Sequence, residues 1–196
     1  MMVETDRQAV VRWAASVTAD STVRYLDTET TGLGDDAEIV EIAILDGQGT
    51  VLLETLIRPN RRIPPDATAL HTITNAMVRD APGWPEVYFE TIRLLAGHPC
   101  IVYNADFDRR ILDQVNREHG LEPLRATWHC AMKQYAAFAG VRHPRYGGYR
   151  WHKLEQAAAA FSIPLAAHRA RADAEACRAL VRAMAGVSRP SHSLLR

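Results

Sequence analysis

The sequence predicts one α/β domain with a mixed central β-sheet flanked by helices. Three β-rich runs come first, and helical patterns then alternate with one further short strand, an order typical of α/β domains. The length of 196 residues and a hydrophobic share of 47% allow one sizeable core with a short appendage at each end. The chain contains no internal repeat, low-complexity stretch or linker.

A helix and three strands are expected first along the chain. Residues 4–18 carry an apolar stripe at helical spacing, which predicts a helix within an N-terminal extension at residues 1–20. Three β-rich runs follow, at residues 22–27, 38–46 and 51–57. Because Gly47 and Gly49 form a turn between the second and third runs, these two should pair as an antiparallel hairpin.

Loops, helices and one short strand make up the rest of the predicted domain, which spans residues 21–186. The Pro-rich segment 58–65 cannot continue a strand ladder and predicts an extended loop, followed by short helical turns around His71. A buried strand is expected at residues 99–103 and a flexible tail at residues 187–196. Amphipathic or alanine-rich patterns predict helices at residues 85–96, 107–119, 128–139, 153–161 and 170–185.

Composition excludes several classes of protein. Lys+Arg and Asp+Glu both total 23, so the formal net charge is zero and long, non-specific binding to duplex DNA is not expected. The apolar runs are shorter than the ~20 residues of a membrane span, and the acidic start lacks a signal-peptide core, so we expect a cytoplasmic protein without membrane contact. Three isolated cysteines suit reduced thiols rather than a disulfide framework or a zinc site.

Five residues able to bind metals or transfer protons stand at three separate places in the chain. They are Asp27, Glu29, Asp108, His168 and Asp173. Because Asp27 and Glu29 are two residues apart on a predicted strand, their side chains should point to the same face, where they repel each other unless cations lie between them. Such oxygen ligands suit Mg²⁺ or Mn²⁺, and two ions ~4 Å apart can hold both the attacking and the leaving oxygen of a phosphoryl displacement.

Each of these residues also has an ordinary structural interpretation. Acids at a strand end can simply be solvated. Asp108 could cap a helix, where the helix dipole favours a carboxylate, and Asp106 competes for either role. A lone histidine is usually structural or exposed, although His168 could take a proton from water near neutral pH. The joint occurrence of strand acids, a helix-start acid and His-x4-Asp favours a two-metal phosphodiesterase.

The same residues resemble the motifs of a known family, the DnaQ-like, DEDDh group of 3′→5′ exonucleases. The matching segments are Asp27-Thr-Glu-Thr-Thr-Gly32, Asn104-Ala-Asp-Phe-Asp108 and His168-x4-Asp173. The resemblance covers roughly residues 22–186 and implies a ribonuclease H-like fold. Its second motif assigns Asp108, not Asp106, to the metal. Residues 104–112 and 128–133 look closer to the exonuclease X branch than to the proofreading subunits of replicative polymerases.

The resemblance also implies an activity and a set of site residues. The activity is hydrolysis of 3′-terminal phosphodiesters with release of nucleoside monophosphates. Two Mg²⁺ or Mn²⁺ ions would be held by Asp27, Glu29, Asp108 and Asp173, and His168 would accept the proton of the attacking water. Contacts to the terminal nucleotide are expected from Thr30, Leu70, His71 and Asn104. Thr72 departs from the family, in which glycine usually follows this histidine.

A loop rich in basic and aromatic residues supplies further candidates. Arg145, Tyr146, Tyr149 and Arg150 could grip single-stranded nucleic acid by stacking and charge; the alternative is an ordinary solvated loop.

Substrate and partners stay open at this stage. The leading hypothesis is a DNA exonuclease that acts on single-stranded or frayed 3′ ends in repair or proofreading, with a DNA polymerase or a repair protein as partner. A 3′→5′ exoribonuclease of the same fold would carry the same catalytic set. An inactive nucleic-acid-binding module would be expected to lack at least one ligand, and all five positions are filled.

Overall fold

The computed structural model describes residues 2–145, 147–166 and 168–186. Within these residues a five-stranded sheet has the spatial order β3-β2-β1-β4-β5. The strands are β1 (Arg24–Thr30), β2 (Ile39–Asp46), β3 (Val51–Leu56), β4 (Pro99–Val102) and β5 (Thr127–Cys130). The pairs β1–β2 and β2–β3 are antiparallel, whereas β1–β4 and β4–β5 are parallel. The predicted mixed sheet is therefore confirmed.

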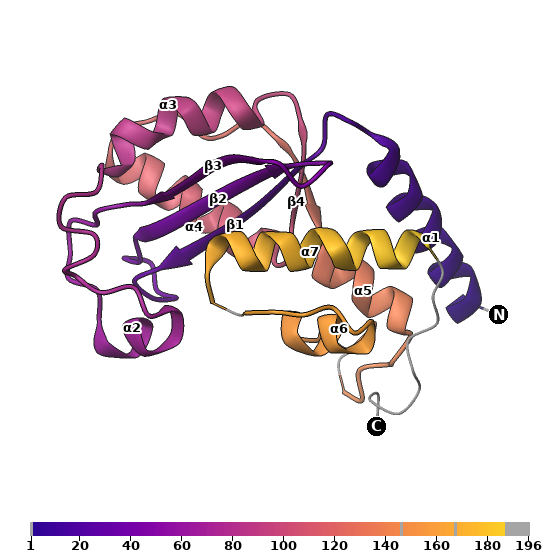
Figure 1. Cartoon of the computed structure of the whole chain (residues 1–196). Coiled ribbons are helices and arrows are strands. Elements are labelled where there is room, and N and C mark those ends of the chain that lie inside the picture. Colours follow the sequence, from indigo (N-terminus) through magenta and orange to yellow (C-terminus); the bar gives the residue numbers. More distant parts are fainter. Residues whose placement is uncertain (1, 146, 167, 187–196) are drawn as a thin grey trace.

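Helices cover both faces of this sheet (Figure 1). They are α1 (Met2–Ala19), α2 (Pro65–His71), α3 (Trp84–Leu95), α4 (Ala105–Glu118), α5 (Ala131–Ala139), α6 (Leu154–Ala160) and α7 (Ala170–Ala185). Buried side chains of α1, α5, α6 and α7 form one hydrophobic core with the sheet. Those of α3 and α4 form a second core on the opposite face.

Successive side chains of β1 enter different cores, and this alternation orients the predicted site. Tyr25 lies in the core under α7, and Leu26 lies in the core under α3 and α4. Because strand side chains alternate between faces, Asp27 and Glu29 face the α7 side. The strand ends at Thr30 rather than at Asp27 as predicted, so both acids stand on regular backbone that is paired with β2.

One predicted helix begins too early. Residues 128–139 were expected to be helical throughout, but Trp128 and His129 belong to β5 and α5 begins at Ala131. Residues 127–130 pair in parallel with residues 99–102, and this long-range pairing overrides the local helical pattern. The edge strand β5 thereby extends the sheet by one strand beyond β4.

The N-terminal helix packs onto the rest of the domain. Val10, Ala14 and Val17 belong to the same core as the buried residues of α5 and α7, and the Trp13 ring lies 6.0 Å from the His129 ring, centroid to centroid. No helix in the described residues is long and apolar enough to cross a bilayer. The predicted tail at 187–196 lies outside the described residues.

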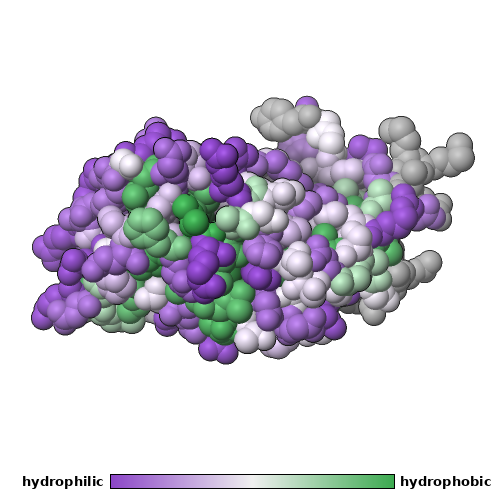
Figure 2. All heavy atoms as spheres, turned by 90° about the horizontal axis from the view of Figure 1, so that it is seen from above, coloured by the Kyte–Doolittle hydropathy of each residue, from purple (hydrophilic) through white to green (hydrophobic). Residues whose placement is uncertain are grey.

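Figure 2 shows the molecule from above the view of Figure 1, and on this face apolar groups lie among hydrophilic ones. They gather mainly in the left half of that view. Large exposed apolar side chains in the described residues are Leu33, Leu70, Met77, Phe89 and Trp151. Because single exposed apolar residues are common on protein surfaces, each needs a second observation before it suggests binding.

Candidate metal centre and active site

Three carboxylates meet where β1 ends and α7 begins. Oxygen atoms of Asp27, Glu29 and Asp173 all lie within 4.8 Å of one another. Asp27 and Glu29 come from β1, and Asp173 comes from the first turn of α7. Converging oxygen donors at this spacing suit a hard divalent cation such as Mg²⁺ or Mn²⁺.

Burial makes this cluster difficult to keep fully charged. Burial, followed by the charges of Asp173 and other carboxylates, raises the pKa of Glu29 to about 8. Burial raises the pKa of Asp173 to about 6. It also raises the pKa of Asp27 well above its usual range, and the nearby charge of Asp108 adds to that increase. Without cations, the cluster therefore favours protonated carboxyls.

Asp108 lies next to this cluster from a different element. It stands in the first turn of α4 and is 3% exposed. Its Oδ1 accepts a hydrogen bond of 2.8 Å from the hydroxyl of Thr28, and its charge is close enough to raise the pKa of Asp27. Asp106, two residues earlier, is exposed and pairs with Lys133 instead. Of these two acids, the structure thus brings only Asp108 to the end of β1.

The segment before α7 carries His168 at the rim of the cluster. His168 has a left-handed backbone, with φ of 65°, and its N–H donates to Asp173 Oδ2 over 3.3 Å. Its Nε2 lies 3.6 Å from Glu155 Oε1, and the ring is partly exposed. Asp173 Oδ1 is buried and has no hydrogen-bond partner among the described residues. A buried carboxylate oxygen without a donor fits a site that a cation completes.

A partly buried ion pair between Glu41 and Arg169, which the sequence analysis did not predict, holds the start of α7. Glu41 of β2 is 2% exposed and lies opposite Glu29 in the β1–β2 register. Both of its oxygens lie 3.1 Å from Arg169 Nε, Arg169 Nη2 donates to Oε1, and the N–H of Ala170 donates to Oε2 over 2.9 Å. One signal was available, because a charged residue within an otherwise apolar strand is almost always paired when buried.

The four residues expected to contact a nucleotide differ in how open they are. Leu70 of α2 is 54% exposed, and Asn104 is partly buried at the N-cap of α4, where its side chain makes no capping hydrogen bond. Thr30 is buried and donates its hydroxyl to the carbonyl of Gly32 over 2.7 Å. His71 is 1% exposed, and its Nδ1 accepts the N–H of Ile73 over 3.0 Å. Leu70 and Asn104 thus have surface that a ligand can contact, whereas Thr30 and His71 are buried.

The basic loop divides into an anchored residue and exposed ones. Tyr149 donates its hydroxyl to the Asp6 carboxylate over 2.5 Å, and the Arg142 guanidinium lies 4.5 Å from the centre of its ring. Tyr149 therefore ties the loop to α1 and is not free to stack on a base. Arg145 and Arg150 are exposed, and Tyr146 lies outside the described residues.

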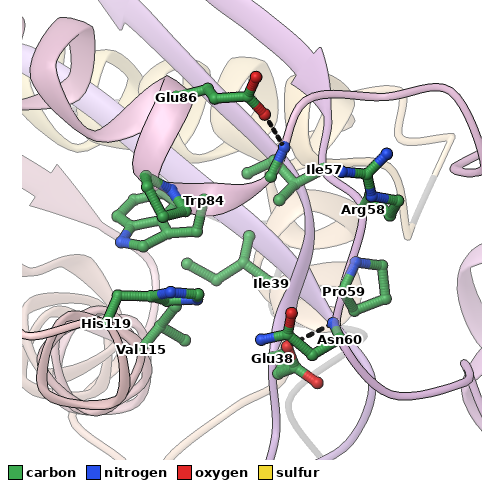
Figure 3. Close-up of a pocket in the computed structure, with 12 residues that line it drawn as sticks. Glu38, Ile39, Ile57, Arg58, Pro59, Asn60, Trp84, Glu86, Val115 and His119 are labelled. Atoms are coloured by element: carbon green, nitrogen blue, oxygen red, sulfur yellow. Dashed lines mark hydrogen bonds between the residues drawn. The ribbon is translucent and has the colours of Figure 1, made fainter.

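A separate cavity of about 430 Å³ lies between the start of β2, the segment after β3 and the start of α3 (Figure 3). Its floor is apolar, with Ile39 and Trp84 among the lining residues. Its buried acid, Glu38, already accepts the backbone N–H groups of Asn60 and Arg61 over 2.7 and 2.9 Å. Because these polar groups are satisfied within the fold, the cavity carries no chemistry comparable to that of the acidic cluster.

The mixed sheet and the carboxylates at the end of its central strand define a metal-dependent phosphodiesterase. The RNase_T family of exonucleases matches residues 25–181. The chain belongs to this exonuclease family, as its motifs predicted, and it is a 3′→5′ exonuclease, a phosphodiester hydrolase. Membership implies dependence on a divalent metal, for which the acidic cluster is the candidate site.

Two related proteins and one solved structure support this assignment. The chain is 43% identical over 169 residues to an uncharacterized exonuclease, CP81, of Escherichia phage 186, which covers 82% of this chain and 87% of that protein. It is 32% identical over 177 residues to DNA polymerase III subunit epsilon of Treponema pallidum (strain Nichols), or 88% of this chain and 80% of that protein. The structure of exonuclease X in complex with 5′ overhanging duplex DNA aligns with a TM-score of 0.64 and 28% identity, covering 85% of this chain and 92% of that one.

Proposed function

We propose that this exonuclease hydrolyses the 3′-terminal phosphodiester of single-stranded or frayed DNA and releases nucleoside monophosphates. The observation that carries the proposal is the meeting of Asp27, Glu29 and Asp173 oxygens within 4.8 Å, at the end of the central strand. Exonuclease X, with which the fold aligns, was solved with DNA, and this favours DNA over RNA.

The residues of the cluster fit two Mg²⁺ or Mn²⁺ ions. Asp27, Glu29, Asp108 and Asp173 are all oxygen donors. Burial, with the charges of neighbouring carboxylates after it, raises the pKa values of Glu29 and Asp173, and bound cations would stabilise the ionised carboxylates. Two ions bound there would supply Lewis acidity to the attacking water and to the leaving 3′ oxygen. The carboxylates would hold the ions in place. The hydroxyl of Thr28 donates to the Asp108 carboxylate and thereby fixes its orientation.

His168 is proposed as the general base. It stands next to Arg169, the N-cap of α7, and its own N–H is tied to Asp173, so its position is coupled to that of a proposed metal ligand. The partly exposed ring can reach a water at the rim, and Glu155, 3.6 Å from Nε2, can stabilise the imidazolium after proton uptake. Leu70 and Asn104 are proposed to contact the terminal nucleotide.

The proposal also includes a cellular role. Similarity to the epsilon subunit of a DNA polymerase favours work beside a polymerase or a repair protein in the cytoplasm. An exoribonuclease with the same catalytic set is the competing function.

A time course on 5′-labelled oligomers tests these statements together. Single-stranded DNA and RNA of one sequence would be incubated with Mg²⁺, Mn²⁺ or EDTA, beside the Asp108→Asn variant and its matched control Asp106→Asn. We expect a metal-dependent ladder that shortens from the 3′ end, faster on DNA, and absent only with EDTA or Asp108→Asn. Faster degradation of RNA would contradict the DNA substrate, and equal loss in both variants would contradict the role of Asp108.

A further inference from the structure

Trp151 is a large exposed aromatic residue on the loop that leads into α6. It is 60% exposed, and it lines a hollow of about 580 Å³ together with Arg150 and neighbouring residues of the loop. An indole this exposed leaves its apolar faces in water, which is unfavourable unless a partner covers them.

The backbone on either side of Trp151 is held in place. The N–H of Arg150 donates to the carbonyl of Val141 over 2.8 Å, and the hydroxyl of Tyr103 donates to the carbonyl of His152 over 2.7 Å. Tyr103 immediately precedes Asn104, which is itself a proposed nucleotide contact. The indole is therefore presented from two anchored points, and little conformational entropy would be lost if a ligand stacked on it.

Exposed cations flank Trp151 in the chain. The sequence has no acidic residue between Glu122 and Glu155, and the Asp6 carboxylate that reaches this loop from α1 accepts the hydroxyl of Tyr149. Among the described residues, Arg150 and Lys153 are exposed and form no ion pair with a carboxylate. Two cations without an ion pair among the described residues therefore stand next to an exposed indole in the chain.

This patch lies within a short stretch of nucleic acid from the acidic cluster. Trp151 is four residues before Glu155, so their Cα atoms are separated by at most about 14 Å. Glu155 in turn lies 3.6 Å from the ring of His168. A strand of about five stacked nucleotides, with bases roughly 3.4 Å apart, spans the part of this path between Trp151 and Glu155, and the 12-mer used below is longer than that.

From these observations, and resting on the proposed function, we propose that Trp151, Arg150 and Lys153 form a second subsite for the substrate strand. The indole stacks on a nucleobase upstream of the terminal nucleotide, and the two cations contact the adjacent phosphates. Exposed aromatic residues interleaved with cations bind single strands in this way without reading sequence. The subsite acts on binding and leaves bond cleavage to the acidic cluster.

Comparing a long with a minimal substrate tests the subsite. The long substrate is a single-stranded DNA 12-mer, and the minimal one is thymidine 5′-(p-nitrophenyl phosphate), which cannot extend to Trp151. Stacking of one base is worth about 1–3 kcal/mol, so Trp151→Ala should lower the preference in kcat/KM for the 12-mer by roughly 5- to 150-fold, chiefly through KM. Trp151→Phe should keep most of the preference.

The matched control is Phe89→Ala, because Phe89 is 71% exposed but belongs to α3 in the other core layer. It should keep the wild-type preference. An unchanged preference in Trp151→Ala overturns the subsite while the proposed function stands, whereas a wild-type protein that cleaves neither substrate overturns the proposed function.

Fluorescence gives a readout that does not depend on turnover. The difference in emission between the wild type and Trp151→Phe isolates this indole, and a titration with the 12-mer in EDTA should quench it. Strong shielding of Trp151 from acrylamide in the free protein would mean that another part of the chain covers it, and this would overturn the proposal as well.

Discussion

Three carboxylates converge at the end of β1, and a fourth, Asp108, lies close enough for its charge to raise the pKa of Asp27. Asp27 and Glu29 share one strand face, Asp173 approaches from α7, and Asp108 approaches from α4. Burial is the main reason why the pKa values of Asp27, Glu29 and Asp173 are raised, since it removes the water that would otherwise solvate the charges, and nearby carboxylates add to it. Each acid therefore weakens the metal-free fold while supplying an oxygen that a cation needs.

Replacing one of these acids should separate function from stability. We expect Asp173→Asn to lower turnover on DNA by at least about 100-fold, since an amide is a weaker ligand for a hard cation. In EDTA its melting temperature should equal or exceed that of the wild type, because one charge is removed from the cluster. Asp106→Asn is the matched control and should keep wild-type activity. Retained activity in Asp173→Asn would contradict its assignment as a metal ligand.

His168 should affect turnover more than metal binding. Loss of a general base commonly costs about 10²–10⁴ in rate, so His168→Ala should lower kcat by that order on the 12-mer. Calorimetric titration with Mn²⁺ should still show binding, because the four carboxylates stay in place. A variant with wild-type kcat would rule out His168 as the base.

At the scale of elements, the start of α7 is held by β2 through an ion pair whose acid, Glu41, is buried and whose arginine, Arg169, is partly exposed. The Glu41 carboxylate accepts hydrogen bonds from the Arg169 guanidinium and from the backbone N–H of Ala170. The helix therefore begins at a defined point beside Glu29, and His168 and Asp173 are placed on either side of that point. A displacement of about 1 Å in such a site can cost about 10² in rate, so this contact is expected to matter for catalysis.

A double-mutant cycle can show whether Glu41 acts through Arg169. We expect Glu41→Gln to lower kcat by roughly 10-fold or more with a smaller change in KM, and Glu41→Gln/Arg169→Gln to be no worse than the more damaging single change. Glu54→Gln removes an exposed pair with Arg171 and should have little effect. Multiplicative losses in the double variant would instead mean that the two residues act independently.

Two predictions from the sequence, for residues 128–130 and for Tyr149, differ from the structure at the scale of elements. Residues 128–130 lie in a pattern that suits a helix, yet they form β5 because β4 offers them a parallel partner. Tyr149 resembled a stacking residue, but its hydroxyl and its ring are engaged by Asp6 and Arg142. In both cases a contact with a distant segment decided the outcome, and local pattern cannot report such contacts.

For the whole molecule, the cluster couples folding to pH and to metal. The folded pKa of Glu29, about 8, and that of Asp173, about 6, exceed the usual values of unfolded acids. The folded state therefore binds more protons between about pH 8 and pH 4, and stability should rise as the pH falls through that window. Bound cations replace those protons and should reverse the trend.

Thermal melts can check this coupling. In EDTA the contribution of these acids should make the protein more stable at pH 6 than at pH 8.5, and the Asp173→Asn variant should show a weaker dependence. With saturating Mn²⁺, the melting temperature at pH 8.5 should rise, since a ligand that binds only the folded state stabilises it. Identical pH profiles with EDTA and with Mn²⁺ would show that the cluster holds no metal.

The sequence by itself determined the chemistry of this protein. Asp27 with Glu29, and His168 with Asp173, are pairs close in sequence, so a strand or a helix start suffices to orient each pair. The order of β-rich and helical runs likewise predicted the mixed sheet, because hydrophobic periodicity is a local property.

Only the tertiary structure decided how these pieces meet. Glu41 and Arg169 are 128 residues apart, and the exposure of Trp151 depends on which elements pack around its loop. Burial and long-range pairing arise only when the chain closes on itself. The identity of the acids was therefore readable from the chain, whereas the ion pair that positions them and the indole presented beside them required the fold.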